Sequence, residues 1–149
     1  MRMLRKHAPS DSAVDLLDKG GRRIQLVRLE TFPGFQRLRQ GPPPTVFRET
    51  GSGLLRLVRR ELVVRFQPRA SGKRRRDILR KHGLVVRRTN AFIPEQVVAH
   101  QPGRRSEGEE LVEVSNELTG LEEVAMATPN FISQYCRQTA PSILPQEWH

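Results

Sequence analysis

The sequence predicts an α+β fold in which a four-stranded antiparallel sheet carries two helices on one face. The elements follow the ferredoxin-like split β-α-β-β-α-β order, and an N-terminal β-hairpin extension precedes them. Three observations lead to this prediction. Residues 61–135 contain four short runs with strand-like apolar patterns. Two helical segments lie between these runs, each bounded by start and stop signals. A chain of 149 residues, 36% of them hydrophobic, is long enough to bury one such core.

The chain divides into three predicted regions. Residues 1–60 form an extension made of short strands and a Pro-rich linker. Residues 61–135 form the two-layer domain itself. Residues 136–149 form an extended tail that is rich in Pro, Ser and Gln.

The extension has weaker signals than the rest of the chain. Residues 1–20 are polar and mixed in charge, which predicts disorder or one weak helix. Residues 22–32 alternate apolar and polar side chains and suit a short strand. Residues 33–45 are punctuated by Pro and Gly, as is typical of a linker. Two strand-like runs then flank Gly51–Gly53, which favours a hairpin through these glycines.

The first strand and the first helix of the domain are predicted between residues 61 and 83. In the stretch "ELVVRFQP", Leu62, Val64 and Phe66 share one face of a strand. The helix that follows begins at Ser71, whose side chain can cap it, and ends at Gly83.

The middle strands and the second helix come next. Residues 84–94 and 95–102 are predicted to form two strands joined by a turn. Residues 106–120 carry the best-signalled helix, because Ser106 and Glu109 fit a capping box at its start.

The last strand is predicted at Val124–Ala127, followed by a break at Pro129 and an extended segment at Phe131–Tyr135. Two helices cover only one face of such a sheet, so the other face is left bare. A bare face is either solvated or covered by a partner.

Net charge sets the class of partner. The chain carries 26 Lys and Arg against 16 Asp and Glu, a net charge of +10, which predicts attraction to something acidic. The segment "GKRRRDILRKHG" gathers six of these cations, as phosphate-binding surfaces do. A basic ferredoxin-like nucleic-acid-binding module is therefore the alternative function. A solvated basic face explains the same cluster, and residues 95–102 lack the stacking aromatics of RNA-binding sheets.

Catalytic and metal-binding motifs are not found in the sequence. The four histidines have no nucleophile nearby and no metal-ligand spacing; they are His7, His82, His100 and His149. A single cysteine, Cys136, excludes an internal disulfide and a cysteine-based metal cluster. We therefore expect that this chain alone is not an enzyme and holds no metal or cofactor.

The N-terminus begins with basic residues, as a signal peptide does, but no apolar run follows. No stretch approaches the roughly 20 apolar residues that a membrane span needs. A cytoplasmic location and no membrane partner are the expectation, with export by an unusual route left open.

From Glu61 to His149 the chain resembles the N-terminal prosegment of subtilisin-like serine proteases. The stretches that carry the resemblance follow the family's order: "ELVVRFQP", "ILRKHGLVV", "NELTGLEEVAMATPNFI" and "ILPQEWH". Residues 1–60 lie outside it. The first helix is more basic than is usual in the family, and the family's secretion signal is missing.

The resemblance implies a propeptide that acts as an intramolecular chaperone and as the inhibitor of a serine endopeptidase zymogen. Its partner would be the cognate subtilisin-like catalytic domain, which supplies the catalytic triad and any calcium ion. The bare sheet face would dock on two surface helices of that domain. The extended C-terminus would lie in the substrate cleft like a cleaved product.

The resemblance also suggests which residues enter the cleft. Tyr135 would fill the first pocket, followed by Gln134 and Ser133, with Ile132 in the fourth, and autoprocessing would cut between Tyr135 and Cys136. Ile132 and Tyr135 equally suit the end of the sheet. If cleavage falls at the end of the chain instead, the residues in the cleft are Gln146, Glu147, Trp148 and His149.

Overall fold

The computed structural model describes residues 13–29, 45–102 and 108–133. They form an α+β fold with two helices and a seven-stranded, antiparallel, open sheet. The strands are β1 (Ala13–Leu17), β2 (Arg23–Leu29), β3 (Val46–Glu49), β4 (Leu55–Phe66), β5 (Val85–Thr89), β6 (Gln96–His100) and β7 (Val124–Ser133). The helices are α1 (Gly72–Lys81) and α2 (Gly108–Thr119).

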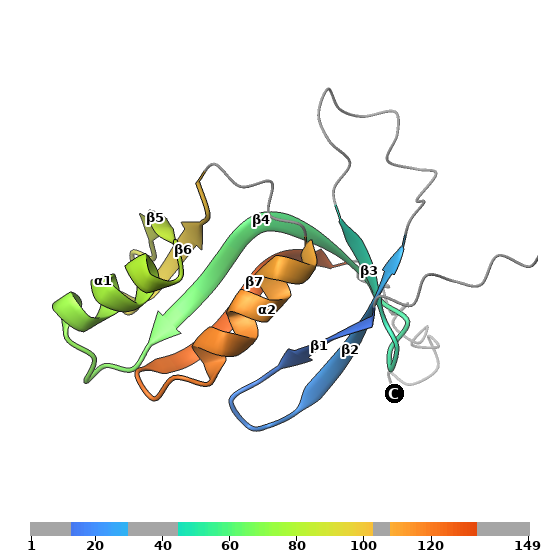
Figure 1. Cartoon of the computed structure of the whole chain (residues 1–149), viewed down its shortest axis with the longest axis horizontal. Helices are drawn as coiled ribbons and strands as arrows, with labels where there is room; N and C mark the ends of the chain where they lie inside the picture. Colours follow the sequence, from blue (N-terminus) through green and yellow to red (C-terminus); the bar gives the residue numbers. More distant parts are fainter. Residues whose placement is uncertain (1–12, 30–44, 103–107, 134–149) are drawn as a thin grey trace, which may run out of the picture.

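Strand β4 lies at the centre of the sheet. Its length of 12 residues lets three other strands pair with it. Its first half pairs with β3 along one edge, and its second half pairs with β6 along that same edge. Strand β7 runs along the opposite edge of both halves. Strands β2 and β1 continue the sheet from β3, and β5 continues it from β6 (Figure 1). The α+β class is confirmed, but the sheet has seven strands instead of the predicted four.

The N-terminal strands and the rest of the chain share one core. The predicted boundary between residues 60 and 61 falls inside β4. Leu26 and Phe47, from β2 and β3, are fully buried in the same apolar cluster as Leu62. The extension is therefore built into the sheet.

Strand β1 corrects the prediction of disorder or a weak helix for residues 1–20, of which the structure describes residues from 13 onward. Its outer edge is bound by α2, because the side-chain amide of Asn116 donates to the carbonyl of Asp15 and accepts from the amide of Leu17. Lys19 adds a bond from Nζ to the carbonyl of Thr119 at 2.9 Å. These contacts join residues that are far apart in the chain, and no pattern in the local sequence reveals them. A prediction from the sequence alone therefore could not include them.

Both helices begin close to where the sequence predicts. The Ser71 hydroxyl accepts a bond from the amide of Arg74 at 3.2 Å, and Gly83 after α1 has the positive φ of +66° that a helix stop requires. Ser106 of the predicted capping box lies outside the described residues. The hydroxyl of Thr45, just before β3, accepts a bond from the amide of Gly108 at 3.2 Å. The first amide of α2 thereby gains a hydrogen-bond partner.

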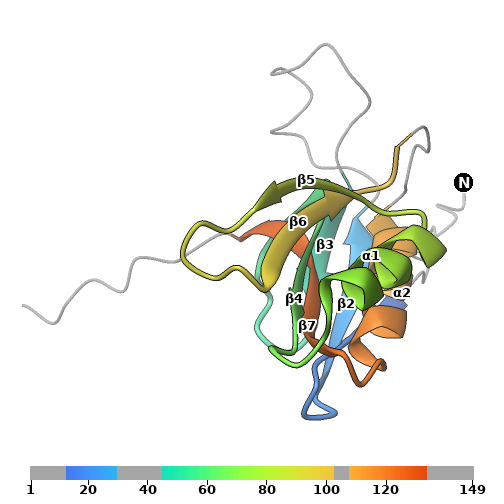
Figure 2. The same cartoon turned by 90° about the vertical axis from the view of Figure 1, so that its left-hand side faces the viewer.

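The core lies between the sheet and the helices, which occupy the same side of the sheet (Figure 2). Leu62, Val64 and Phe66 are at most 1% exposed and confirm the predicted apolar face of this strand. Helix α2 contributes Leu111 and Leu118, which are fully buried.

Strand β7 is continuous, so the predicted break at Pro129 is wrong. Pro129 lies opposite Leu62, at a point where the register between β4 and β7 shifts. A proline is tolerated there because β7 is hydrogen-bonded to a strand on only one side. On its other side, the hydroxyls of Ser115 and Thr119 donate to the carbonyl of Ala127.

Candidate functional site

The side of the sheet away from the helices carries a surface that we call the open face. Its members come from alternate positions of four strands and are cross-strand neighbours: Met126 and Thr128 of β7, Val63 and Arg65 of β4, Gln96 and Val98 of β6, and Arg88 of β5. They point away from the helices because Leu62 and Val64, their neighbours in β4, point into the core.

The open face has a valine centre and a more polar periphery. Val98 is only 9% exposed and Val63 is half-buried, whereas Met126 is 38% exposed and Arg65 and Arg88 are exposed. Flat surfaces with an apolar centre and a polar rim are typical of protein-binding sites.

Glu61 lies next to this face and joins three strands. Its side chain is 10% exposed; Oε1 accepts from Nη1 of Arg87 and Oε2 from Nδ2 of Asn130, both at 2.8 Å. Burial raises the pKa of Glu61, but the bond from Asn130 and the charge of Arg87 outweigh it, with further help from neighbouring arginines. The net result is a pKa below the ordinary value of 4.5, so the carboxylate is charged at neutral pH.

The predicted cleft residues divide between the sheet and the tail. Ile132 and Ser133 are the last residues of β7, where they pair with Leu57 and Arg56 of β4. The side chain of Ile132 points outward and is 52% exposed. The other predicted residues lie outside the described residues: Gln134, Tyr135, Cys136, Gln146, Glu147, Trp148 and His149.

Arg56 makes the most extensive set of contacts at the end of β7. Its Nε and Nη2 donate to Oε2 of Glu49 at 2.9 and 2.6 Å, and its Nη1 donates to the hydroxyl of Ser133 at 3.2 Å. Its guanidinium carbon also lies 5.6 Å from the ring centre of Phe131. These contacts were not predictable from the sequence, because one arginine in a run rich in arginine carries no sign of which neighbours it meets.

A cavity of about 250 Å³ opens between the β1–β2 hairpin and β7. Its lining is mainly apolar and includes Leu16, Ile24, Met126 and Phe131. Among residues 13–29, 45–102 and 108–133, no group of three His, Cys, Asp or Glu side chains is placed to hold a metal ion.

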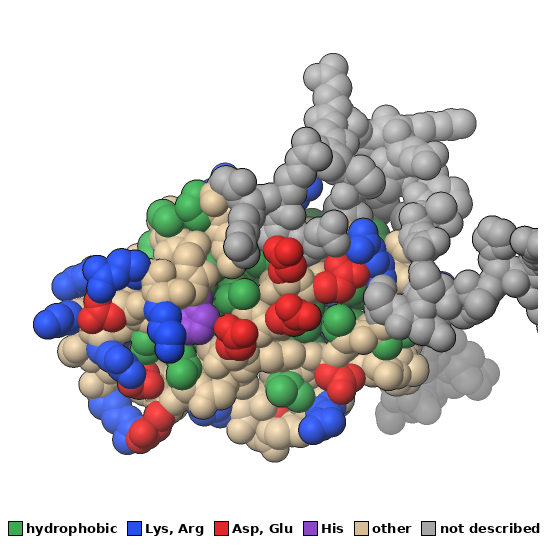
Figure 3. All heavy atoms as spheres, in the orientation of Figure 1, with side chains coloured by type: hydrophobic (Ala, Val, Ile, Leu, Met, Phe, Trp, Pro, Cys, Tyr) green, Lys and Arg blue, Asp and Glu red, His purple; other side chains and the backbone are tan. Residues whose placement is uncertain are grey.

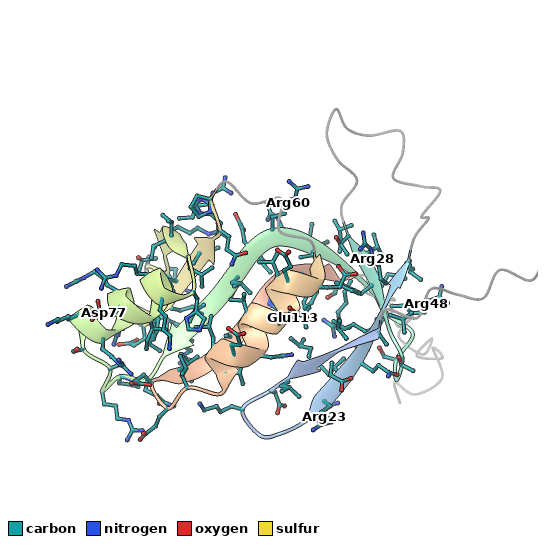
Figure 4. The ribbon with its side chains drawn as sticks, in the orientation of Figure 1. Arg23, Arg28, Arg48, Arg60, Asp77 and Glu113 are labelled. Carbon is teal, nitrogen blue, oxygen red and sulfur yellow. The ribbon has the colours of Figure 1, made fainter. Side chains whose placement is uncertain are left out.

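The basic segment includes the whole of α1, and charged side chains are unevenly distributed over the described surface. Figure 3 shows Lys and Arg side chains gathered over α1, with acidic side chains over α2, where Glu113 is exposed (Figure 4). Arg74 and Arg80 form ion pairs with Glu123 and Asp77. The remaining exposed cations of α1 and its end are Lys73, Arg76 and Lys81.

His82 occupies the C-cap of α1. Its Nδ1 lies 2.9 Å from the carbonyl oxygen of Ile78, and its Nε2 lies 3.6 Å from a carboxylate oxygen of Glu117 in α2. The ring therefore links the ends of the two helices and has the surroundings of a structural residue.

No protein family, curated protein or solved structure matches this chain. Neither of the two described helices is long and apolar enough to cross a membrane.

Proposed function

We propose that the chain is the prosegment of a subtilisin-like serine protease, which helps the catalytic domain to fold and then blocks its substrate cleft. The observation that carries the proposal is the course of β7. This strand forms one border of the open face and ends in the extended pair Ile132 and Ser133, directly before residues 134–149 in sequence. In this proposal, the docking surface and the first residues of the cleft-binding segment belong to one strand.

The strand order supports the family resemblance. We infer that β7, β4, β6 and β5 form a ferredoxin-like unit, with β1–β3 as an addition to it. In this order every neighbouring pair is antiparallel, and α1 and α2 come after the first and third strands in sequence. That is the connectivity of the split β-α-β-β-α-β motif.

The open face suits docking on a protein in its chemistry. Its valine centre is apolar, and its arginines can meet carboxylates at the rim. A stable complex typically buries about 800 Å² on each partner.

The tail would inhibit by adding a strand to the protease. An extended segment binds an exposed strand edge through backbone hydrogen bonds, while alternate side chains enter pockets. We propose Ile132, Ser133, Gln134 and Tyr135 for these positions, with processing between Tyr135 and Cys136. In the alternative placement, Gln146 to His149 would occupy the substrate cleft instead.

The chaperone role follows from the topology of the partner. Subtilisin-like catalytic domains contain a parallel sheet with many distant contacts, and such sheets form slowly. A preformed surface that binds the nascent domain lowers this barrier.

The proposal is tested by refolding. A subtilisin-like catalytic domain is diluted from denaturant with and without residues 1–149, and recovery of peptidase activity is measured after the chain is removed by proteolysis. We expect recovery to rise with chain concentration and to saturate near equimolar amounts. Equal recovery with bovine serum albumin in place of the chain would contradict the proposal.

Nucleic-acid binding is the second candidate, favoured by the exposed cations of α1. Phosphate contacts by Lys73, Arg76 and Lys81 would be independent of sequence and would weaken steeply with salt. Tight binding of RNA or DNA at physiological salt, together with no effect on protease folding, would favour this candidate over the first.

A further inference from the structure

We propose that Arg56 is a positioning residue that holds the last residues of β7, directly before the C-terminal tail in sequence, and that the N-terminal strands serve to hold Arg56. This inference rests on the proposed function, because the tail is the segment that would enter the protease cleft. It assigns a role to the N-terminal strands, which the family resemblance does not cover.

The first step concerns the pairing of β4. Only its second half lies in the proposed ferredoxin-like unit, yet β7 continues past that unit and pairs with the first half as well. The pairs there are Val58 with Phe131, Leu57 with Ile132 and Arg56 with Ser133. This first half of β4 is itself held in a sheet by β3 on its other edge. The end of β7 is therefore ordered by a part of the sheet that the N-terminal strands complete.

The second step concerns the side chains. Glu49 of β3 holds the guanidinium of Arg56 through two N–H groups, and the remaining nitrogen reaches Ser133. Both partners of the ion pair are largely buried, with side-chain exposures of 22% and 14%. A largely buried, charge-assisted contact of this kind fixes geometry better than an exposed pair does.

The third step concerns the hairpin that connects them. The amide of Glu49 donates to the carbonyl of Leu54, and the amide of Gly53 donates to the carbonyl of Glu49 at 2.8 Å. Gly53 has a φ of +69°, a conformation that favours glycine. A closed hairpin thus keeps Glu49 beside Arg56, and Arg56 beside the last residue of β7.

The consequence is preorganisation of the last residues of β7. A segment that is already extended and correctly aimed loses less conformational entropy when it binds, so its affinity is higher without any new contact. Ile132 and Ser133 are held in this way, directly before the proposed residues Gln134 and Tyr135.

The experiment compares three variants of residues 1–149. Arg56→Gln removes the link, and Glu49→Gln weakens it without touching β7. Arg69→Gln is the matched control, because it removes the same charge and an ion pair of 2.6 Å to Glu122, both exposed. Two readouts are taken: amide hydrogen exchange by mass spectrometry, and the inhibition constant against the catalytic domain.

For Arg56→Gln we expect exchange at residues 131–133 to rise roughly tenfold, the effect of losing the charge-assisted bond to Ser133, which is the one that reaches β7. Exchange in β6 stays unchanged. The inhibition constant rises by a similar factor, whereas Arg69→Gln alters neither quantity. The double variant Glu49→Gln/Arg56→Gln is no weaker than Arg56→Gln, because both substitutions act on the same link.

Two results overturn the inference while the proposed function stands: inhibition by Arg56→Gln equal to that of Arg69→Gln, or unchanged exchange at residues 131–133. If Arg56→Gln also exposes β6 to exchange, Glu49→Gln takes its place in the comparison under the same criteria. A wild-type chain that inhibits no subtilisin-like protease removes the proposed function and this inference together.

Discussion

Asn130 donates a 2.8 Å hydrogen bond from its side-chain amide to the carboxylate of Glu61, across the gap between β7 and β4. Arg87 approaches the same carboxylate from β5, but its side chain is 65% exposed and its charge is screened by water. The bond from Asn130 is therefore the stronger reason for the lowered pKa of Glu61.

Stability in acid depends on this carboxylate. Because the pKa of Glu61 is lower in the folded chain than in the unfolded one, its contribution is complete above the ordinary value of 4.5 and is lost as pH falls through the folded value. We expect Asn130→Ala to lower the free energy of unfolding at pH 7 by about 1–3 kcal/mol. Urea unfolding at several pH values measures this.

The matching variant is Glu61→Gln. It keeps a side chain of the same size but cannot titrate, so its stability should fall less steeply than that of the wild type as pH is lowered below the ordinary value of 4.5. Parallel curves for the two chains would show that Glu61 is not the group responsible.

Gly108 begins α2 at a point where a side chain does not fit. A Cβ atom there would lie 2.7 Å from Cγ2 of Thr45 and 3.0 Å from Cε2 of Phe47. We expect Gly108→Ala to destabilise the chain by about 1–3 kcal/mol, because β3 must move away from the helix. Thermal unfolding followed by circular dichroism measures the change.

Gly72→Ala is the control for this substitution. Gly72 also begins a helix, but its added Cβ would meet only the end of the flexible Arg76 side chain at 3.7 Å. Alanine is the better helix former by roughly 0.5–1 kcal/mol, so this variant should be as stable as the wild type or more stable. Equal losses at Gly72 and Gly108 would contradict the close packing of α2 against β3.

Asn116 ties β1 to α2 by two bonds, of 2.6 Å to the carbonyl of Asp15 and 2.9 Å from the amide of Leu17. Asn116→Ala leaves both backbone groups without these partners. We expect a loss of about 1–3 kcal/mol, with faster amide exchange confined at first to β1. Glu113→Ala, on the exposed side of the same helix, should change neither quantity.

The exposed cations of α1 predict how the chain finds an acidic partner. Replacing Lys73, Arg76 and Lys81 with Gln should slow association with the protease and make the association rate less dependent on salt. Surface charges attract an approaching partner only over about a Debye length, which is roughly 10 Å at 0.1 M salt. The dissociation rate should change little. Stopped-flow measurement at several salt concentrations separates the two rates, and an unchanged association rate would show that these cations do not steer the encounter.

The sequence predicted the local elements that carry period or capping signals. Ser71 and Gly83 bound α1 as expected, and Gly51–Gly53 does join two strands. The prediction failed where contacts between residues far apart in the chain determine the structure. Strand β1 is held in place by α2, which binds its outer edge. Strand β7 can pass through Pro129 because, among the described strands, β7 pairs with β4 alone.

The candidate site shows the same division. Alternation in "ELVVRFQP" correctly separated the buried side of β4 from the side that forms the open face. The two links at Glu61 and Arg56 were not predictable, since each joins residues at least 69 positions apart in the chain. Ile132 and Ser133 also pair with the first half of β4, which lies before Glu61 and therefore outside the family resemblance.

The inhibition constant of three chain lengths against a subtilisin-like catalytic domain tests the central claim most directly. Residues 1–133 retain every described element, residues 1–135 add Gln134 and Tyr135, and residues 1–149 include the whole tail. We expect 1–135 to inhibit as well as 1–149, and 1–133 to inhibit more weakly by roughly a hundredfold, the effect of emptying a buried aromatic pocket. Weak inhibition by 1–135 beside strong inhibition by 1–149 would place the end of the chain in the cleft. Equal inhibition by 1–133 and 1–149 would contradict the claim that the tail blocks the protease.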